Sequence, residues 1–409
     1  METNLTFMVL HVTDRCNLRC VYCYERDRPG KAVKTMDLQL ATTAVDWLIR
    51  QSGQKKNLRI VFFGGEPLMN FPLIRETVAY ANNVSQSKGK TITYEISTNG
   101  TLLTREIIHF FKEHKIVPTI SMDGTKVIQD RQRPFKNGKG SHEKVVLRIR
   151  DLLDAIPQTG CNAILMDGKN HRNVFNELRK LGFKKIGLSP PNSLSPARQK
   201  MLPENILNND DAWFTSELLQ NSEKLLKYIN ARDIDGIRSI TQISPLVGIM
   251  ELIVKNVHRR IPCGAGRSSV AVSPDGDIFP CHRFTGLDQF RLGNVSSPQA
   301  MRNFNSANRL DETPACQSCN ARHLCAGGCP HDNFMTTGNH TTPSGNSCGR
   351  MQKAYSVATK LADSVDDSDL KFLSIQHFFF PEECTLDFKD SRQSLRSPGR
   401  NLSRVLNLD

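Results

Sequence analysis

The stretch that decides the fold is Cys16-Asn-Leu-Arg-Cys20-Val-Tyr-Cys23, which follows directly after an apolar run at residues 7–12. It sets three thiols on one short loop, close enough to converge on one face of a 4Fe-4S cubane. Three protein ligands leave one iron with an open coordination position. An open position on a metal is where a cofactor or substrate binds, whereas structural sites are closed. The stretch therefore predicts a reactive iron-sulfur cluster.

Outward from this loop, the first half of the chain repeats a short β-rich run followed by a helical pattern. This alternation is typical of βα units and predicts an α/β fold with a parallel sheet. The expected strands are residues 7–12, 58–63, 92–97, 117–121, 162–166 and 185–188. Cys16, Gly64, Asn99 and Asp123 each lie just past the carboxyl end of an expected strand, where α/β folds place their chemistry.

Composition narrows the classes of protein that fit. The 409 residues are 38% hydrophobic and 23% charged, which suits one large and one smaller domain. No apolar run approaches the roughly 18 residues of a membrane span, and the first residues lack a signal-peptide pattern, so we expect a cytoplasmic protein with no membrane partner. Twelve cysteines in a long chain indicate metal binding more than disulfides. The net charge of +13 is spread along the chain, which does not favour nucleic acid.

The patterns divide the chain into four segments. Residues 1–191 carry the βα repeats, and residues 192–262 are predicted to form a helical bridge. Residues 263–350 form a small cysteine-rich domain in which metal replaces part of an apolar core. Residues 351–409 begin as a helix and end in a Ser-, Arg- and Asn-rich tail that we expect to be disordered.

The first cysteine array resembles that of the radical S-adenosylmethionine (SAM) superfamily, whose hallmark is CxxxCxxC with an aromatic residue, here Tyr22, before the last cysteine. The resemblance implies a partial (β/α)6 TIM-like barrel. It implies that Cys16, Cys20 and Cys23 hold a 4Fe-4S cluster whose open iron chelates SAM. In that superfamily one electron then cleaves SAM to a 5'-deoxyadenosyl radical, and the resemblance therefore implies a low-potential donor such as flavodoxin or ferredoxin as a partner.

The resemblance also assigns contacts to SAM. Gly64-Gly65-Glu66-Pro67 matches the family's GGEP motif, which contacts the methionine amino group. Ser121 and Arg133 match positions that bind the SAM carboxylate in sulfatase-maturase-like members, and an arginine fork suits a carboxylate. The expected cofactor contacts are Tyr22, Gly64, Gly65, Glu66, Pro67, Asn99, Ser121 and Arg133.

A second cysteine array occupies the later part of the chain. Its members are Cys263, Cys281, Cys316, Cys319, Cys325, Cys329 and Cys348. A zinc-binding interaction module is the competing interpretation, because CxxC pairs also form structural zinc sites. Seven thiolates fit two zinc tetrahedra poorly and fit two cubanes with one vacancy better.

The array resembles the SPASM domain of radical SAM peptide and protein maturases, which binds two auxiliary 4Fe-4S clusters. By that resemblance Cys263, Cys281 and Cys329 hold the nearer cluster. The outer cluster is then held by Cys316, Cys319, Cys325 and Cys348. The chain is thus expected to carry three 4Fe-4S clusters and SAM, and to act on a peptide or protein substrate.

Two departures from sulfatase maturases affect the expected product. An eighth cysteine of those enzymes is absent from Gly264-Ala-Gly-Arg-Ser-Ser, which implies an auxiliary iron open to a substrate thiolate. His282 stands where they carry a catalytic aspartate, and we take it as the candidate catalytic residue. Cys-His-Arg-Phe-Thr-Gly looks more like thioether-forming maturases of six-cysteine peptides and of quinohemoprotein amine dehydrogenase. We expect a thioether cross-link; the alternatives are formylglycine formation and carbon-carbon cross-linking.

The sequence contains no segment that is recognisable as a peptide-recognition domain. Many thioether-forming relatives carry an N-terminal peptide-recognition domain, whereas only fifteen residues precede Cys16. The barrel mouth, the bridge or a separate peptide-recognition protein is therefore expected to take that role.

Metal analysis tests both arrays together. Three cubanes predict about twelve irons and as many sulfides per chain after anaerobic reconstitution. Iron and sulfide assays with a parallel zinc measurement check this. Substantial zinc beside a single cubane would contradict the second array's assignment.

Overall fold

The computed structural model describes residues 5–27, 33–166, 170–189, 211–241, 244–297, 301–304, 310 and 313–378. The chain divides into two compact units. The first unit comprises Met1–Leu207 and Gly264–Asn305, and the second comprises Asn208–Cys263 and Ser306–Asp409.

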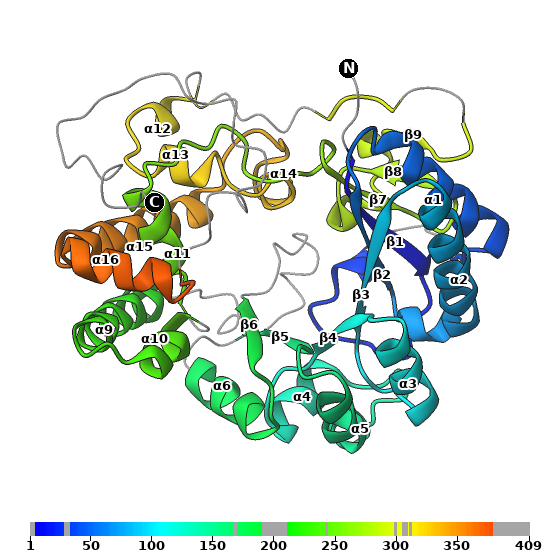
Figure 1. Cartoon of the computed structure of the whole chain (residues 1–409), viewed down its shortest axis with the longest axis horizontal. Coiled ribbons are helices and arrows are strands. Elements are labelled where there is room, and N and C mark those ends of the chain that lie inside the picture. The colour runs from blue at the N-terminus through cyan, green and yellow to red at the C-terminus, as the bar shows by residue number, and fades with distance from the viewer. Residues whose placement is uncertain are drawn as a thin grey trace. The chain divides into compact units, whose positions relative to one another are not determined.

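The elements of the first unit alternate strand and helix as the sequence predicts (Figure 1). Its strands are β1 (Phe7–Thr13), β2 (Asn57–Gly64), β3 (Thr91–Thr98), β4 (Val117–Ser121), β5 (Gly160–Ile164), β6 (Lys185–Ser189), β7 (Ser269–Val272), β8 (Asp277–Phe279) and β9 (Gly293–Asn294). Its α-helices are α1 (Leu38–Gln51), α2 (Phe71–Ser87), α3 (Arg105–Glu113), α4 (Lys126–Gln132), α5 (His142–Ala155) and α6 (His171–Lys180). Short 3-10 helices are η1 (Tyr24–Asp27), η2 (Pro67–Asn70), η4 (His282–Phe284) and η5 (Asp288–Phe290).

The strands form one sheet in the order β6-β5-β4-β3-β2-β1-β7-β8-β9. Neighbours from β1 to β6 are all parallel, and Figure 1 shows α1 to α6 along one side of them. The six expected strands are therefore confirmed, each within about two residues of its predicted bounds. The expected fold class, a partial βα barrel with a parallel sheet, is confirmed with them.

The second cysteine array does not form one contiguous domain. β7 pairs in parallel with β1, and the β7-β8-β9 hairpins extend the large sheet from that edge. Residues 264–305 consequently belong to the first unit, whereas the rest of the array belongs to the second. This division differs from the predicted segments because strand pairing between residues 7–10 and 269–272 leaves no local signal in the sequence.

Helix caps fix where the helices beside the site begin. The Asp37 side chain accepts from the backbone N–H of Leu40 at the start of α1. Thr104 caps α3, and Thr125 caps α4 by accepting from the N–H of Ile128. Each cap satisfies an N–H group that would otherwise lack a partner, typically worth about 1 kcal/mol. The cap on α4 sets the register of the helix that ends at Gln132, directly before Arg133.

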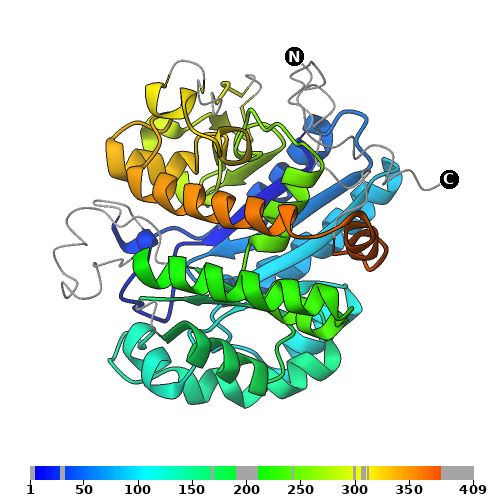
Figure 2. The same cartoon turned by 90° about the vertical axis from the view of Figure 1, so that its left-hand side faces the viewer.

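The second unit is helical. Its helices are α9 (Asp211–Asn230), α10 (Ile234–Thr241), α11 (Leu246–Val254), α12 (Pro314–Gln317), α13 (Arg322–Cys325), α14 (Pro330–Thr337), α15 (Gly345–Asp363) and α16 (Asp367–Ile375). Figure 2 shows α9 (green) and α15 (orange) side by side. Apolar side chains of α9, α11, α15 and α16 share one buried cluster. The expected bridge is thus part of a core, and the expected disordered tail lies outside the described residues.

In the part of the chain that the structure describes, no single helix is long and apolar enough to cross a membrane. The bent pair α10 and α11 passes that test only when its two helices are taken together. Residues of α11, among them Leu246 and Met250, are buried in the core of the second unit.

The end of β2 approaches the end of β1 so closely that it requires glycine. Gly64 has φ +134°, and an added Cβ would lie 2.2 Å from the carbonyl oxygen of Thr13. The N–H of Gly65 donates to that same oxygen at 2.9 Å, so the contact sets the start of the cysteine loop.

We expect Gly64→Ala to lower the thermal midpoint of the reconstituted protein by several degrees, because strain and the backbone contact together cost roughly 3 kcal/mol. Gly89→Ala is the matched control: Gly89 also has a positive φ, +63°, but an added Cβ meets nothing within 4 Å. Its cost should be only about 1–2 kcal/mol. Equal midpoints for the two variants would contradict the close contact.

Candidate functional site

The three thiols of the first array are brought together on the loop after β1. Cys16, Cys20 and Cys23 are half-buried, and the thiols of the last two interact electrostatically with Cys16. Burial raises the pKa of Cys16 to about 11 and that of Cys20 to about 12, and the neighbouring thiols add to this. Thiolates gathered in such a place need a cation to be stable, so the donor set fits an iron-sulfur cluster.

Glu66 links the carboxyl ends of β2 and β3. The residue is 0% exposed. Its Oε1 accepts from the backbone N–H of Leu68 at 3.1 Å and from the Thr98 hydroxyl at 2.7 Å. Its Oε2 accepts from the N–H of Asn99 at 2.7 Å. Burial raises the pKa of the carboxyl to about 7 against these lowering hydrogen bonds. The carboxylate that the sequence predicts as a SAM contact therefore holds two strand ends together.

The amide of Asn99 lies against the cysteine loop. Its Nδ2 donates to Asn17 Oδ1 at 2.9 Å and lies 4.0 Å from Cys16 Sγ. Its Oδ1 accepts from both the backbone N–H and the hydroxyl of Thr101. Asn17 closes the ring by donating to the Thr101 hydroxyl at 2.8 Å. The expected cofactor residue Asn99 therefore also positions the loop that carries Cys16.

A buried carboxylate connects two of the predicted cofactor contacts. Asp123, 0% exposed, accepts through Oδ2 from the Tyr22 hydroxyl at 2.5 Å and lies 3.0 Å from Arg133 Nε. Its Oδ1 accepts from the backbone N–H of Ile164, the last residue of β5, at 2.9 Å. The Arg133 guanidinium also lies 5.2 Å from the centroid of the Tyr22 ring. Asp123 follows two residues after Ser121, the last residue of β4.

The sequence predicts the position of Asp123 at a strand end but not its role in this network. It marked the residue as lying beyond a strand end, and nothing local points to partners in the cysteine loop and after α4. Asp123 raises the pKa of the Arg133 guanidinium further above its usual range, against the effect of burial. Arg133 is thus held as a cation beside the cysteine loop, as a carboxylate-binding residue requires.

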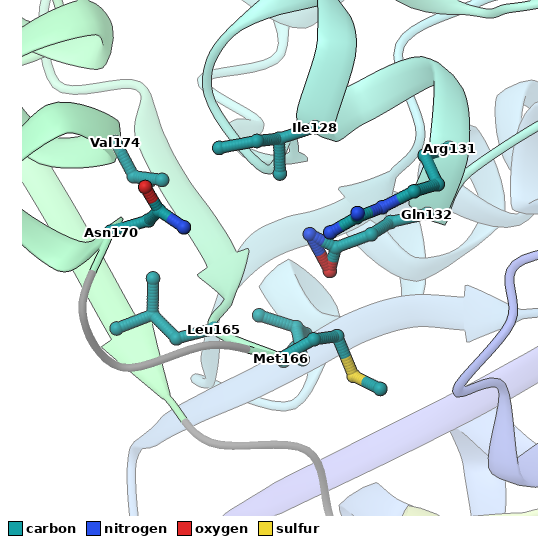
Figure 3. A pocket seen from close by; sticks show the side chains of 8 residues that line it. Ile128, Arg131, Gln132, Leu165, Met166, Asn170 and Val174 are labelled. Carbon is teal, nitrogen blue, oxygen red and sulfur yellow. The ribbon is translucent and has the colours of Figure 1, made fainter. Parts of the chain in front are cut away.

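A small hollow lies behind this network (Figure 3). Gln132, at the end of α4, faces it together with Asn170 and Met166. Met166 packs on Tyr22 of the cysteine loop, so the hollow lies next to residues that hold this loop in place. About 10 Å³ of it is open, roughly the room of one water molecule. None of the predicted site residues lines it.

His282, the candidate catalytic residue, lies at the strand ends from which the cysteine loop starts. Its ring centroid is 5.0 Å from that of Phe63 in β2 and 6.4 Å from that of Tyr24 in η1. Phe63 in turn lies 5.3 Å from His11 of β1. The Thr285 hydroxyl, from the same turn as His282, is 3.4 Å from His11 Nε2.

Sequence reasoning missed the surroundings of His282. Ligand atoms of His11, Asp14 and Glu25 lie within 4.8 Å of one another, so a polar group of side chains sits beside the aromatic one. A histidine within the otherwise apolar β1 was the only available signal, because Phe63 and Tyr24 resemble ordinary core residues in the sequence.

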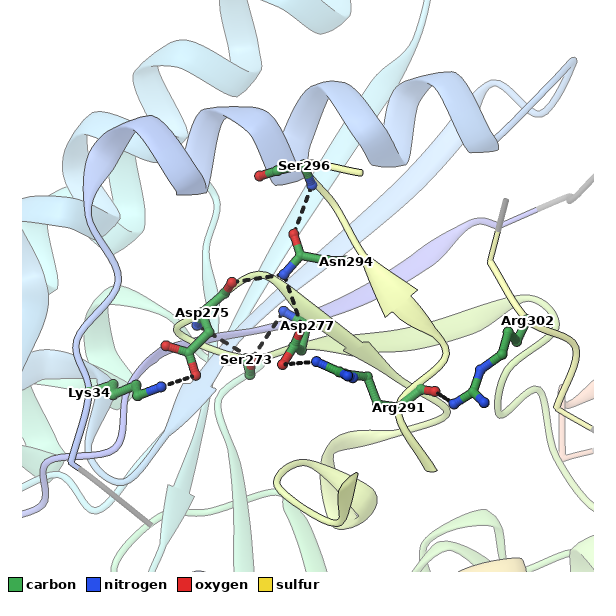
Figure 4. Close-up of polar contacts among 8 residues, drawn as sticks. All are labelled: Lys34, Ser273, Asp275, Asp277, Arg291, Asn294, Ser296 and Arg302. Carbon is green, nitrogen blue, oxygen red and sulfur yellow. Dashed lines mark hydrogen bonds and ion pairs between the residues drawn. The ribbon is translucent and has the colours of Figure 1, made fainter. Parts of the chain in front are cut away.

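A polar network holds the hairpins that lead to His282 (Figure 4). The Ser273 hydroxyl accepts from the N–H of Asp277 at 3.2 Å, and Asp277 accepts from Asn294 at 2.9 Å. Lys34 donates to Asp275 at 2.8 Å, which ties the segment before α1 to the β7-β8 turn. Both aspartates therefore shape the turn.

In the second unit four thiols gather in one place. Cys316 and Cys325 both interact electrostatically with Cys319 and Cys348, and burial raises the pKa of Cys316, Cys325 and Cys348. Gln352 Nε2 donates to Cys319 Sγ at 3.5 Å. Four thiols around one point fit a closed cluster, and they are the set expected for the outer one.

The nearer auxiliary cluster keeps the status of a prediction. Cys281 belongs to the first unit, whereas Cys263 and Cys329 belong to the second. Its ligand set, and the open iron inferred from it, are therefore left to experiment.

Comparison with known proteins finds two family models in the parts of the chain that carry the cysteine arrays. Residues 10–181 match the radical SAM superfamily, and residues 263–330 match SPASM, an iron-sulfur cluster-binding domain. A cysteine-type anaerobic sulfatase-maturating enzyme of Clostridium novyi is 26% identical over 354 residues, covering 80% of this chain and 88% of that protein. A serine-type enzyme of Klebsiella aerogenes is 25% identical and covers 77% of each chain.

Among solved structures, anSMEcpe with bound AdoMet and the Cp18Cys peptide has a similar fold. Its TM-score is 0.65 at 18% identity, covering 88% of this chain and 99% of that one. At this identity the similarity supports the fold alone. It agrees with the partial barrel that the strand order indicates.

The buried pair of Asp123 and Arg133 yields a test. We expect Asp123→Asn to destabilise the protein by about 3–5 kcal/mol, because it leaves the Arg133 charge buried without its partner. It should also weaken SAM binding. The double variant Asp123→Asn/Arg133→Met should regain most of the stability but not the binding.

Urea unfolding and equilibrium dialysis with labelled SAM measure the two effects separately. Recovery of SAM binding in the double variant would contradict the assignment of Arg133 to the cofactor.

Proposed function

We propose that this chain, which belongs to the radical SAM superfamily and carries a SPASM domain, oxidises a side chain of a peptide or protein substrate in the manner of sulfatase-maturating enzymes. The product would be an aldehyde, formylglycine, made from a cysteine or serine. Similarity to such enzymes over about four fifths of the chain supports this. This similarity is the observation that carries the proposal, and the geometry adds a candidate proton acceptor, because His282 lies beside Phe63 and Tyr24 at the strand ends where the cysteine loop starts.

Residues of the cysteine loop and Arg133 would hold the cofactors. Cys16, Cys20 and Cys23 would ligate the first cluster, and Arg133, kept cationic beside Asp123, would bind the SAM carboxylate. When bound, SAM and the clusters supply a hydrogen-atom acceptor and an electron acceptor. The protein's own part is to hold the substrate side chain in reach and to take up a proton.

His282 is the residue we assign to that proton. Converting a –CH2–SH or –CH2–OH group to an aldehyde removes one hydrogen atom, one electron and one proton from the substrate side chain. For cysteine, water then replaces sulfur, which leaves as hydrogen sulfide. An imidazole beside the reacting carbon would accept the proton of the thiol or hydroxyl. The rings of Phe63 and Tyr24 would limit water around it.

A thioether cross-link is the second candidate, and it now has less support than aldehyde formation. Two features of the chain favour it: His282 replaces the aspartate of sulfatase maturases, and Ser269 stands where they carry a further cysteine. Both reactions start by removing a hydrogen atom from the substrate. The two reactions differ afterwards, because a cross-link retains the sulfur of the cysteine whereas aldehyde formation releases it.

The partners of the proposed reaction follow from its chemistry. The substrate would be a peptide or an unfolded segment of a protein, since a side chain within a folded core cannot reach a buried site. A one-electron donor of low potential, such as flavodoxin or ferredoxin, would start each turnover. A separate peptide-recognition protein remains a proposal of the same kind.

We expect His282→Ala to lower product formation on a sulfatase-derived peptide about 100-fold, the usual contribution of a general base. Cleavage of SAM to 5'-deoxyadenosine should persist, because the first cluster's ligands are untouched. His109→Ala, which removes an exposed histidine of α3, is the matched control and should leave both unchanged.

Mass spectrometry and a hydrazide reagent identify the product. Aldehyde labelling supports the first candidate, whereas loss of thiol without any aldehyde selects the cross-link. Undiminished product from His282→Ala would remove His282 from the mechanism.

A further inference from the structure

The cysteine loop is paired along its outer side with the turn at residues 132–139. The N–H of Arg19 donates to the Pro134 carbonyl at 2.8 Å, and the N–H of Lys136 donates to the Asn17 carbonyl at 3.3 Å. Leu18 and Phe135 form an antiparallel bridge between these two bonds. The loop and the turn therefore make one continuous piece of surface.

This surface carries an excess of exposed cations. Arg15 and Arg19 lie on the loop, Lys136 and Lys139 lie on the turn, and all four are exposed. We call these four residues the cationic surface. Among the ion pairs between described residues, none includes Arg15, Lys136 or Lys139. Asp130, the carboxylate at the base of the turn, is matched by Lys126 at 2.8 Å. Arg15, Lys136 and Lys139 therefore carry positive charge that no ion pair between described residues neutralises.

A hollow opens the first cluster's position to this surface. It holds about 380 Å³ and is lined by Asp14, Cys16, Leu18, Arg19 and Lys136. A predicted cluster ligand and two residues of the cationic surface therefore line the same hollow. A protein seated on the cationic surface would come close to the cluster without entering the barrel.

From these three observations we infer that the cationic surface is the docking site of an acidic one-electron carrier protein. The inference rests on the proposed function, because a radical SAM enzyme needs one electron delivered to its first cluster for each cleavage. The carrier's reduced cofactor loses that electron and the cluster gains it, and no bond is made. Opposite charges on the two proteins would speed their encounter and fix its orientation.

The test reverses charge on the turn and leaves the loop intact. The surface variant is Lys136→Glu/Lys139→Glu in the reconstituted holoenzyme. The matched control is Lys56→Glu/Lys88→Glu, which makes the same change in net charge. Lys56 and Lys88 are exposed and lie just before β2 and β3, at the amino ends of the strands and thus away from the cysteine loop.

The first readout is the binding of an acidic flavodoxin, measured by calorimetry at low ionic strength. We expect Kd to rise about tenfold or more for the surface variant and to change less than twofold for the control. Added salt should weaken the wild-type complex toward the value of the surface variant, since exposed charges are screened. An unchanged Kd in the surface variant would overturn the inference.

The second readout separates docking from chemistry. With dithionite as reductant, wild type and both variants should form 5'-deoxyadenosine at the same rate. With reduced flavodoxin, only the surface variant should be slowed, by about the factor seen in Kd. A surface variant slowed equally by both reductants would overturn the inference, because the lysines would then act on the cluster itself. Absence of SAM cleavage by wild type with dithionite would instead count against the proposed function.

Discussion

The buried carboxylate of Asp123 is the interaction on which the geometry of the site depends. A carboxylate with no exposure must be matched by donors, since an unmatched charge costs several kcal/mol in a protein interior. Its donors come from three segments: Tyr22 of the cysteine loop, Arg133 after α4 and Ile164 at the end of β5. Moving any one of them would leave the others incompletely satisfied. Two predicted cofactor contacts are therefore positioned by a residue that no cofactor needs to touch.

Local signals explain what the sequence could predict. Cysteine spacing and β-rich runs are contained within a few residues, and they led to the cluster loop and to the parallel strands β1 to β6. The link between Tyr22 and Asp123 joins residues 101 positions apart, so no window of sequence contains it. The pairing of β7 with β1 is equally non-local, which is why the cysteine-rich segment was expected to be one domain. The thioether expectation rested on His282 and a missing cysteine, whereas similarity to sulfatase maturases extends over most of the chain.

The histidine at position 282 changes the electrostatics of the proposed proton transfer. An aspartate that takes up a proton loses its charge, whereas a histidine that does so gains one. The Phe63 ring, tilted by 47° with its centroid 5.0 Å from that of His282, lies within the range at which an aromatic ring attracts a cation. The aromatic surroundings and the change from aspartate to histidine are thus physically consistent with each other. A carboxylate at the same place would have lost hydration without gaining this compensation.

The place of β7 in the sheet has a consequence for biosynthesis. β1 is synthesised before the other strands of the sheet, and the partner of its second edge, beginning with the pair of Phe7 and Ser269, is made about 260 residues later. At about 5–20 residues per second, that edge stays open on the nascent chain for on the order of ten to fifty seconds. Open strand edges are templates for aggregation. The order of the strands along the chain therefore leaves this edge open to wrong pairing during translation, and a chaperone that covers it would lower that risk.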